Sequence, residues 1–203
     1  MREQEVIKVL QSELNFSDQS IGKLKIFEKN LLKINKEYNF ISKSTENSIW
    51  SRHILDSAQL VKFINFDQGS LSDLGSGGGF PGIVLAIFNK NSAFHVKLYE
   101  KSPVKRKFLD EMLIKLEIKA NVLPSIYDEK IESEYIVCRA FKKLDTIIQV
   151  SREIAKKPHK LIILKGKNAQ EEINKALKIE KTSYKLVQSM TNENSKILIM
   201  RFT

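Results

Sequence analysis

The clearest chemical signal in the sequence is a glycine-rich segment from Asp73 to Gly82, which reads Asp-Leu-Gly-Ser-Gly-Gly-Gly-Phe-Pro-Gly. Six of the eight glycines in the chain lie between Gly69 and Gly82. Glycine lets the backbone approach a ligand closely and adopt φ values that other residues avoid. We therefore expect a ligand-binding loop here, between a strand and a helix.

The spacing within this loop discriminates among ligands. Counted from Gly75, the sixth position is Phe80 and not the glycine of a dinucleotide-binding fingerprint, and the Gly-Lys-Ser/Thr of a phosphate-binding P-loop is absent. The remaining pattern, Asp-x-Gly-x-Gly, is typical of loops that cradle the amino-acid part of S-adenosylmethionine. Glu100 supports this interpretation, because it ends an apolar run 25 residues after Gly75, where a carboxylate accepts hydrogen bonds from ribose hydroxyls. The alternative is a solvated glutamate at a strand end.

Two kinds of periodicity indicate the elements that position these residues. Before residue 66 the pattern is helical, with apolar residues every three or four positions over residues 17–38, Ser17 or Asp18 as N-cap, and a second pattern after Ser44. The apolar face of the second pattern comprises Ile49, Trp50, Ile54, Ala58 and Val61.

After Gly69, short apolar runs alternate with helical stretches. The runs expected to form strands are Leu71–Leu74, Phe94–Tyr99, Ala120–Leu123, Tyr135–Phe141, Leu161–Leu164, Tyr184–Met190 and Ile197–Phe202. The helical stretches are Gly82–Phe88, Val104–Leu116, Leu144–Ala155 and Ala169–Leu177. This alternation predicts an α/β fold with a seven-stranded, mostly parallel sheet and helices on both faces. The last two runs lack a helix between them, which predicts a final hairpin with one antiparallel strand. A helical extension over residues 1–66 is expected to pack on a domain of residues 67–203.

Charge is distributed unevenly along the 203 residues, which carry 34 Lys and Arg against 24 Asp and Glu, a net charge of +10. Residues 1–70 hold 10 basic and 9 acidic side chains, net +1, whereas residues 71–203 hold 24 and 15, net +9. Such an asymmetry suits a polyanion such as nucleic acid, but a lysine-rich surface without that function explains the charge equally well.

Composition also disfavours some classes of protein. One Cys and three His are too few for a zinc site of four such ligands, so no metal is expected. The lone Cys138 cannot form an intramolecular disulfide, which favours a reducing compartment. No apolar run reaches the length of a membrane span, and the N-terminus is charged from Arg2 onward. We therefore expect a cytoplasmic protein without a membrane partner.

Four motifs, in this order along nearly the whole chain, resemble the ribosomal small-subunit RNA methyltransferase G family, also called glucose-inhibited division protein B. They are Arg52-His53-Ile54-Leu55-Asp56-Ser57, the glycine loop, Cys138-Arg139-Ala140-Phe141 and Leu164-Lys165-Gly166. The first motif is the discriminating one, because many methyltransferases share the glycine loop. The resemblance implies the Rossmann-like fold of class I S-adenosylmethionine-dependent methyltransferases. It also implies methyl transfer to N7 of guanine 527, in the 530 loop of 16S rRNA, with 16S rRNA or the 30S subunit as the partner. We expect the protein to be a monomer.

The resemblance also implies contacts to the cofactor, S-adenosylmethionine. In the family, a pair of residues that contacts the cofactor follows the third strand. The Arg that the family has after the position of Asn121-Val122 is missing here, and the following loop is shorter. We therefore align the pair to Asp128 and Glu129. Arg139 should contact the cofactor carboxylate or O6 of the guanine, and its alternative is an ion pair with Glu134 or Asp145. The resulting cofactor-binding candidates are Gly75, Gly77, Phe80, Glu100, Asp128, Glu129 and Arg139.

The helix with the first motif is implied to lie over the cofactor pocket. We assign Arg52 to RNA contact and His53 to shaping the pocket. The alternatives are that Arg52 forms an exposed ion pair with Asp56, four residues later, and that His53 is a packed helix residue without a role in the site.

Basic residues near the strand ends are candidates for contacts with rRNA phosphates, although for each lysine alone a solvated position is the better interpretation. The cluster comprises Lys101, Lys105, Arg106, Lys107, Lys142, Lys143, Lys165 and Lys167. Together with Arg52, the substrate contacts selected from it are Lys105, Arg106 and Lys165.

The implied reaction requires little from the protein. Guanine N7 carries an unprotonated lone pair, and the sulfonium methyl group is already activated, so no general base is expected and Arg139 and His53 are candidates for positioning only. Two rival functions remain, a methyltransferase of this fold acting on a small molecule or protein, and an inactive RNA-binding module. The charge asymmetry disfavours the first rival, and intact Gly75, Glu100 and Arg139 disfavour the second.

Overall fold

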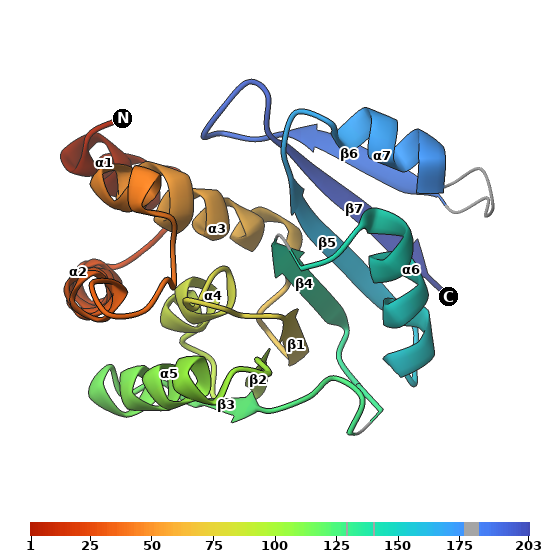
Figure 1. Cartoon of the computed structure of the whole chain (residues 1–203), viewed down its shortest axis with the longest axis horizontal. Helices are drawn as coiled ribbons and strands as arrows, with labels where there is room; N and C mark the ends of the chain where they lie inside the picture. Colours follow the sequence, from red (N-terminus) through yellow and green to blue (C-terminus); the bar gives the residue numbers. More distant parts are fainter. Residues whose placement is uncertain (129, 140, 177–182) are drawn as a thin grey trace.

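The structure is a computed structural model that describes residues 1–128, 130–139, 141–176 and 183–203 (Figure 1). Its helices are α1 (Glu3–Ser12), α2 (Asp18–Asn35), η1 (Lys43–Ser48), η2 (Trp50–Leu55), α3 (Asp56–Ala58), η3 (Gln59–Phe63), α4 (Gly82–Phe88), α5 (Pro103–Lys115), α6 (Leu144–Ile154) and α7 (Ala169–Ala176). Its strands are β1 (Gly69–Leu74), β2 (Phe94–Tyr99), β3 (Ala120–Leu123), β4 (Tyr135–Arg139), β5 (His159–Lys165), β6 (Tyr184–Gln188) and β7 (Lys196–Phe202).

The described strands form one seven-stranded sheet in the order β3-β2-β1-β4-β5-β7-β6. The pairs from β3 through β5 are parallel, and β7 runs antiparallel to both β5 and β6. The predicted mostly parallel sheet with a final hairpin is therefore confirmed. Strand order reverses at β1 and β4, and in open α/β sheets ligands bind beyond the carboxyl ends of the strands at such a point.

The two faces of the sheet are covered by different helices. Side chains alternate across a strand, so Val137 of β4 and Ile162 of β5 belong to one core, while Ile136 and Ile163 belong to the other. Figure 1 shows α6 and α7 on one side of the sheet and α1, α2, α4 and α5 on the other. Because both faces are buried, the central strands read as continuous apolar runs.

The N-terminal helices share a core with the sheet. Leu10 of α1 and Phe27 of α2 are fully buried in the same cluster as Leu71 of β1. The Ser17 hydroxyl accepts a hydrogen bond from the Ser20 N–H at 3.2 Å, which confirms Ser17 as the N-cap of α2. No helix in the described parts of the chain is both long and apolar enough to cross a membrane.

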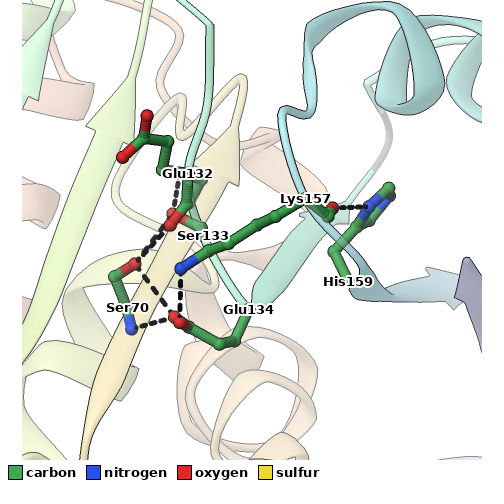
Figure 2. Close-up of polar contacts among 7 residues, drawn as sticks. Ser70, Glu132, Ser133, Glu134, Lys157 and His159 are labelled. Carbon is green, nitrogen blue, oxygen red and sulfur yellow. Dashed lines mark hydrogen bonds and ion pairs between the residues drawn. The ribbon is translucent and has the colours of Figure 1, made fainter. Parts of the chain in front are cut away.

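Polar contacts tie the start of β1 to the start of β4, at the amino end of the sheet (Figure 2). Glu134 Oε2 accepts the Ser70 N–H at 2.6 Å, and Glu134 Oε1 pairs with Lys157 Nζ at 2.5 Å. Gly69 has a φ of +101°, and a Cβ at this position would lie 2.7 Å from Glu134 Oε2. The glycine thus permits the contact that fixes these two strands side by side.

Gly82, at the first turn of α4, provides a test of how closely this helix packs on the sheet. A Cβ at Gly82 would lie 2.2 Å from Leu98 Cδ2 and 2.6 Å from Asp73 Oδ2, whereas Gly22 in α2 has no atom within 4 Å of the same position. Gly82→Ala should lower the free energy of unfolding by about 1–3 kcal/mol through overpacking. The control Gly22→Ala should raise it by about 0.5–1 kcal/mol, because alanine favours a helix interior. Denaturant unfolding measures both, and a Gly82→Ala variant as stable as the wild type would contradict the close packing of α4.

Candidate functional site

The glycine loop is fixed at the carboxyl end of β1 by contacts on both sides. The N–H groups of Gly75 and Ser76 both donate to the Tyr99 carbonyl at 2.9 Å. Asp73 Oδ2 accepts the Gly82 N–H at 3.0 Å, so this carboxyl joins the end of β1 to the start of α4. Asp73 is fully buried, burial raises its pKa to about 7, and its Oδ1 has no hydrogen-bond partner among the described residues.

Gly75 and Gly77 are two of the three glycines in the loop that have a positive φ. Gly75 and Gly77 have φ values of +74° and +57°. A Cβ on Gly75 would lie 2.5 Å from the Phe141 ring, so any other residue would clash with the segment after β4. The loop can therefore follow its path at the sheet edge only with glycine at these positions.

Glu100 lies directly after β2, as the sequence predicts, and faces the loop. Its Oε2 accepts the Gly77 N–H at 2.9 Å, and its Oε1 accepts the Ser102 N–H at 2.8 Å. Glu100 is only 8% exposed. Because each carboxylate oxygen can accept more than one hydrogen bond, Glu100 is held in place and can still accept bonds from a ligand.

The loop and Glu100 line a cleft of about 620 Å³ at the carboxyl end of the sheet. Glu100 is the one acidic residue among the described residues of this cleft, which also presents Lys101, Lys105, Lys142 and Arg139. Its remaining lining residues are Phe40, Gly75, Ser76, Gly77, Gly78, Phe80, Tyr99, Pro124, Ser125, Ile126, Tyr127 and Phe141. This size is typical of sites for a nucleoside-sized ligand.

Arg139 contributes a charge to the wall of this cleft. Its guanidinium carbon lies 4.9 Å from the centre of the Phe80 ring, and its Nη1 donates to the Arg52 carbonyl at 3.4 Å. Burial lowers the pKa of Arg139, while the nearby carboxylates of Asp56 and Asp73 raise it. The alternative partner Glu134 instead pairs with Lys157 at the other end of the sheet.

His53 packs on the same aromatic ring. Its ring centre lies 5.1 Å from that of Phe80, and its Nε2 lies 2.8 Å from Thr45 Oγ1. Burial, followed by the charges of Arg139 and Arg52, lowers the pKa of His53 to about 3. His53 is therefore uncharged near neutral pH and is a weak base.

A smaller hollow adjoins the cleft. Its volume is about 370 Å³, and it shares Phe40 and Arg139 with the cleft. Its other lining residues are Ile41, Ser42, Thr45, Arg52, His53, Asp56, Thr191 and Ser195. We call it the side hollow.

A π-helix contributes two residues, Arg52 and His53, to the lining of the side hollow. The second predicted helical pattern is divided into η1, the π-helix η2, α3 and η3, and its residues Ile49, Trp50, Ile54 and Ala58 are buried as predicted. Turns of π-helix are rare and occur often at functional sites. Arg52 is exposed, and the described contacts of Asp56 go to Gln59, Ser189 and Thr191 rather than to an ion pair with Arg52.

Some predicted site residues lie elsewhere. Asp128 is exposed and is not part of the cleft lining, because β3 ends at Leu123 and the four residues 124–127, which come between, line the cleft instead. A contact of Asp128 with the cofactor stays a prediction. Glu129 lies outside the described residues.

Two of the predicted RNA contacts have partners within the protein. Arg106 Nη1 donates to the carbonyls of Glu100 at 3.0 Å and Lys101 at 2.7 Å, so it fixes the turn after β2. Lys165 forms an ion pair with Glu172. Lys105 does line the cleft, with its Nζ 5.9 Å from the centre of the Phe40 ring.

Sequence reasoning missed several aromatic residues of the cleft. Phe40, Tyr127 and Phe141 all line it, and Tyr127 is 60% exposed. Phe141 is part of a recognised motif but has no role assigned from it. In the sequence, Phe141 is followed directly by Lys142, and aromatic residues interleaved with lysines are the signal that could have identified this part of the cleft.

The chain is similar in sequence to proteins of one known family. A profile of the family described as rRNA small subunit methyltransferase G matches residues 20–199. The protein of that name from Orientia tsutsugamushi (strain Boryong) is 35% identical over 199 residues, covering 98% of each chain. The one from Rickettsia felis is 40% identical over 182 residues, covering 88% of this chain and 91% of the relative.

Similar solved structures show the fold. A crystal structure of a SAM-dependent methyltransferase from Aquifex aeolicus has a TM-score of 0.62 and 14% identity, and covers 87% of this chain and 98% of that one. An O-methyltransferase from Bacillus cereus in complex with SAH has a TM-score of 0.59 and 12% identity, and covers 97% of this chain and 96% of that one. The chain thus has the class I methyltransferase fold predicted from its sequence.

The buried position of His53 has a consequence for its titration. Because its pKa is lowered to about 3, its ring resonances should not shift between pH 5 and 8 in an NMR titration. The unfolded chain binds a proton on this group near pH 6.5 and the folded chain does not, so its contribution should make the protein less stable as the pH falls below about 6.5. A titration midpoint near 6 for His53 would contradict its burial between Phe80 and the two arginines.

Proposed function

The chain belongs to the rRNA small subunit methyltransferase G family, and from this premise we propose that it transfers a methyl group from S-adenosylmethionine to N7 of a guanine in 16S rRNA. The guanine implied by the sequence resemblance is guanine 527 of the 530 loop. The observation that carries the proposal is the pair of adjoining cavities, one lined by the glycine loop and Glu100 and the other by Arg52 and His53, with Arg139 in the wall of both. We propose further that the protein acts as a monomer in the cytoplasm.

The cleft has the donors and acceptors that S-adenosylmethionine requires. Glu100 would accept hydrogen bonds from the ribose hydroxyls, since its two oxygens keep free acceptor positions beside the bonds from Gly77 and Ser102. The glycine loop offers a backbone without Cβ atoms for the amino-acid part, and Arg139 offers a cation for its carboxylate. When bound, S-adenosylmethionine supplies an activated methyl group.

The protein's contribution to the reaction is positioning. Guanine N7 carries a lone pair that needs no deprotonation, which fits a site whose histidine is neutral and a weak base. Arg139, which packs on the Phe80 ring, lines both cavities and would align the base with the methyl donor. Rate acceleration then comes from orientation and from exclusion of water.

The basic rim of the cleft supports an RNA substrate over a small molecule or protein. Lys101, Lys105 and Lys142 lie around an opening in which Glu100 is the one described acidic residue. Positive side chains there would contact rRNA phosphates, while the aromatic rings of Phe40 and Tyr127 offer surfaces for unstacked bases.

A methyl-transfer assay tests the proposed function. Radiolabelled methyl groups from S-adenosylmethionine should appear in 16S rRNA, and we expect Glu100→Gln to raise the Kd for S-adenosylmethionine by about 10–100-fold, the effect of weakening charged hydrogen bonds. The control Glu132→Gln removes an equal charge from a residue that pairs with Lys156, away from the cleft, and should leave the Kd unchanged.

The assay should offer 30S subunits, naked 16S rRNA and total protein in parallel, so that the rival substrates are included. Label in protein and none in RNA would overturn the proposal. So would wild-type affinity for S-adenosylmethionine in Glu100→Gln, because the cleft would then not be the donor site.

The rim lysines can be tested through the salt dependence of RNA binding. Lys105→Ala should weaken binding at low salt and reduce the slope of log K against log[salt] by about 1, the contribution of one phosphate contact. Lys8→Ala changes an exposed lysine of α1 and should leave the slope unaltered. Equal slopes for Lys105→Ala and the wild type would show that Lys105 contacts no phosphate.

A further inference from the structure

We propose that the side hollow receives the target base and that Asp56 selects guanine, by accepting hydrogen bonds from its N1–H and 2-amino group while an arginine donates to O6. This inference rests on the proposed function and specifies how the same site chooses its substrate. It assigns a role in base selectivity to Asp56, whose place in the sequence suggested only a surface partner for Arg52.

The contacts of Asp56 leave one side of its carboxylate available. Its Oδ1 accepts hydrogen bonds from Thr191 Oγ1 at 3.1 Å and Gln59 Nε2 at 3.0 Å, and lies 3.5 Å from Ser189 Oγ. In the described parts of the chain, no hydrogen bond ends on Oδ2. The carboxylate is therefore oriented by several groups through one oxygen, and Asp56 also lines the side hollow.

The charges around Asp56 match one purine and not the other. Arg52 and Arg139 line the same hollow, and Asp56 is its one acidic residue in the described chain. Guanidinium groups can only donate hydrogen bonds and an ionised carboxylate can only accept them. The Watson–Crick edge of guanine offers the acceptor O6 next to two N–H donors, whereas adenine offers an amino donor next to the unprotonated N1. Guanine satisfies both protein groups, and adenine opposes both.

The position of Arg139 links this selection to the reacting atom. O6 and N7 are neighbours on one edge of guanine, and both are acceptors. Arg139 lies in the wall of the cleft and of the side hollow. A guanine whose O6 contacts Arg139 therefore presents N7 toward the cleft that we propose binds S-adenosylmethionine. Its Watson–Crick edge then extends toward Asp56.

The volume and surroundings of the side hollow suit a base turned out of its RNA. At about 370 Å³ it falls within the range of small-ligand sites. Enzymes that modify a base commonly hold it outside the stack and recognise its Watson–Crick edge. Phe40 and the His53 ring, in contact with Phe80, line the same hollow and could pack on the base.

The substitution Asp56→Asn tests base selectivity while keeping the hydrogen bonds that hold residue 56 in place. Asparagine keeps an oxygen for Thr191 and Gln59 but offers an amino group in place of Oδ2, which repels the N–H groups of guanine and accommodates N1 of adenine. The substrates are 16S rRNAs with guanine, inosine or adenine at the target position, where inosine keeps N1–H and O6 and lacks the 2-amino group.

The wild type should prefer guanine to inosine and inosine to adenine. In Asp56→Asn the ratio of kcat/KM for guanine to that for adenine should fall by about 10–100-fold, the discrimination supplied by one bidentate contact. The control Thr191→Val removes the hydrogen bonds of Thr191 Oγ1 with Asp56 Oδ1 and Ser189 Oγ and leaves Oδ2 unchanged, so it should lower the rates for all three RNAs by the same factor.

The possible results have distinct meanings. If Asp56→Asn slows all three RNAs equally and leaves their ratios unchanged, Asp56 only holds the loop before β7 and the inference is wrong. A wild-type protein that methylates no RNA with guanine at the target would instead overturn the proposed function, and this inference with it.

Discussion

The site depends on the contact between the Arg139 guanidinium and the Phe80 ring. Phe80 belongs to the glycine loop, Arg139 ends β4, and His53 of η2 packs on the same ring at 5.1 Å between ring centres. Three segments far apart in the sequence thus meet at one aromatic side chain. That side chain is only 3% exposed, and Arg139, which packs on it, lines both the cleft and the side hollow. A methyl transfer that relies on alignment requires side chains held in place in this way.

The electrostatics of the site follow from this contact. A cation taken out of water must be compensated, and Asp56 and Asp73 lie close enough to raise the pKa of Arg139 against the effect of burial. The same arginine, together with burial and Arg52, keeps His53 neutral. The result is a site with a fixed cation, oriented carboxylates and a neutral histidine that is a weak base. This combination suits transfer to an atom that already carries a lone pair, and it excludes proton abstraction by His53 near neutral pH.

Local patterns allowed much of this structure to be predicted from sequence. The glycine loop and Glu100 were identified because their roles depend on backbone geometry and on position at a strand end, and the strand runs were identified because both sheet faces are buried. The contact of Asp56 with Thr191 joins residues 135 positions apart, so no local pattern reveals it. Arg106 is basic and lies near a strand end, so the sequence predicts an RNA contact. Its hydrogen bonds to the Glu100 and Lys101 carbonyls depend on the turn after β2, which the sequence does not reveal. Asp128 lies outside the cleft lining because the residues that line it follow directly after the end of β3, which no local pattern of acidic residues reveals.

The most direct measurement of the central claim is the chemical identity and position of the methylated nucleotide. 16S rRNA would be incubated with S-adenosylmethionine and the purified protein, digested with nucleases and analysed by mass spectrometry beside RNA incubated without the protein. The account predicts one added methyl group, on N7 of a single guanine in the 530 loop. A methyl group on an exocyclic amine, on ribose or on another base would contradict it, because the account places the N7 edge of guanine beside Arg139, which lines both cavities.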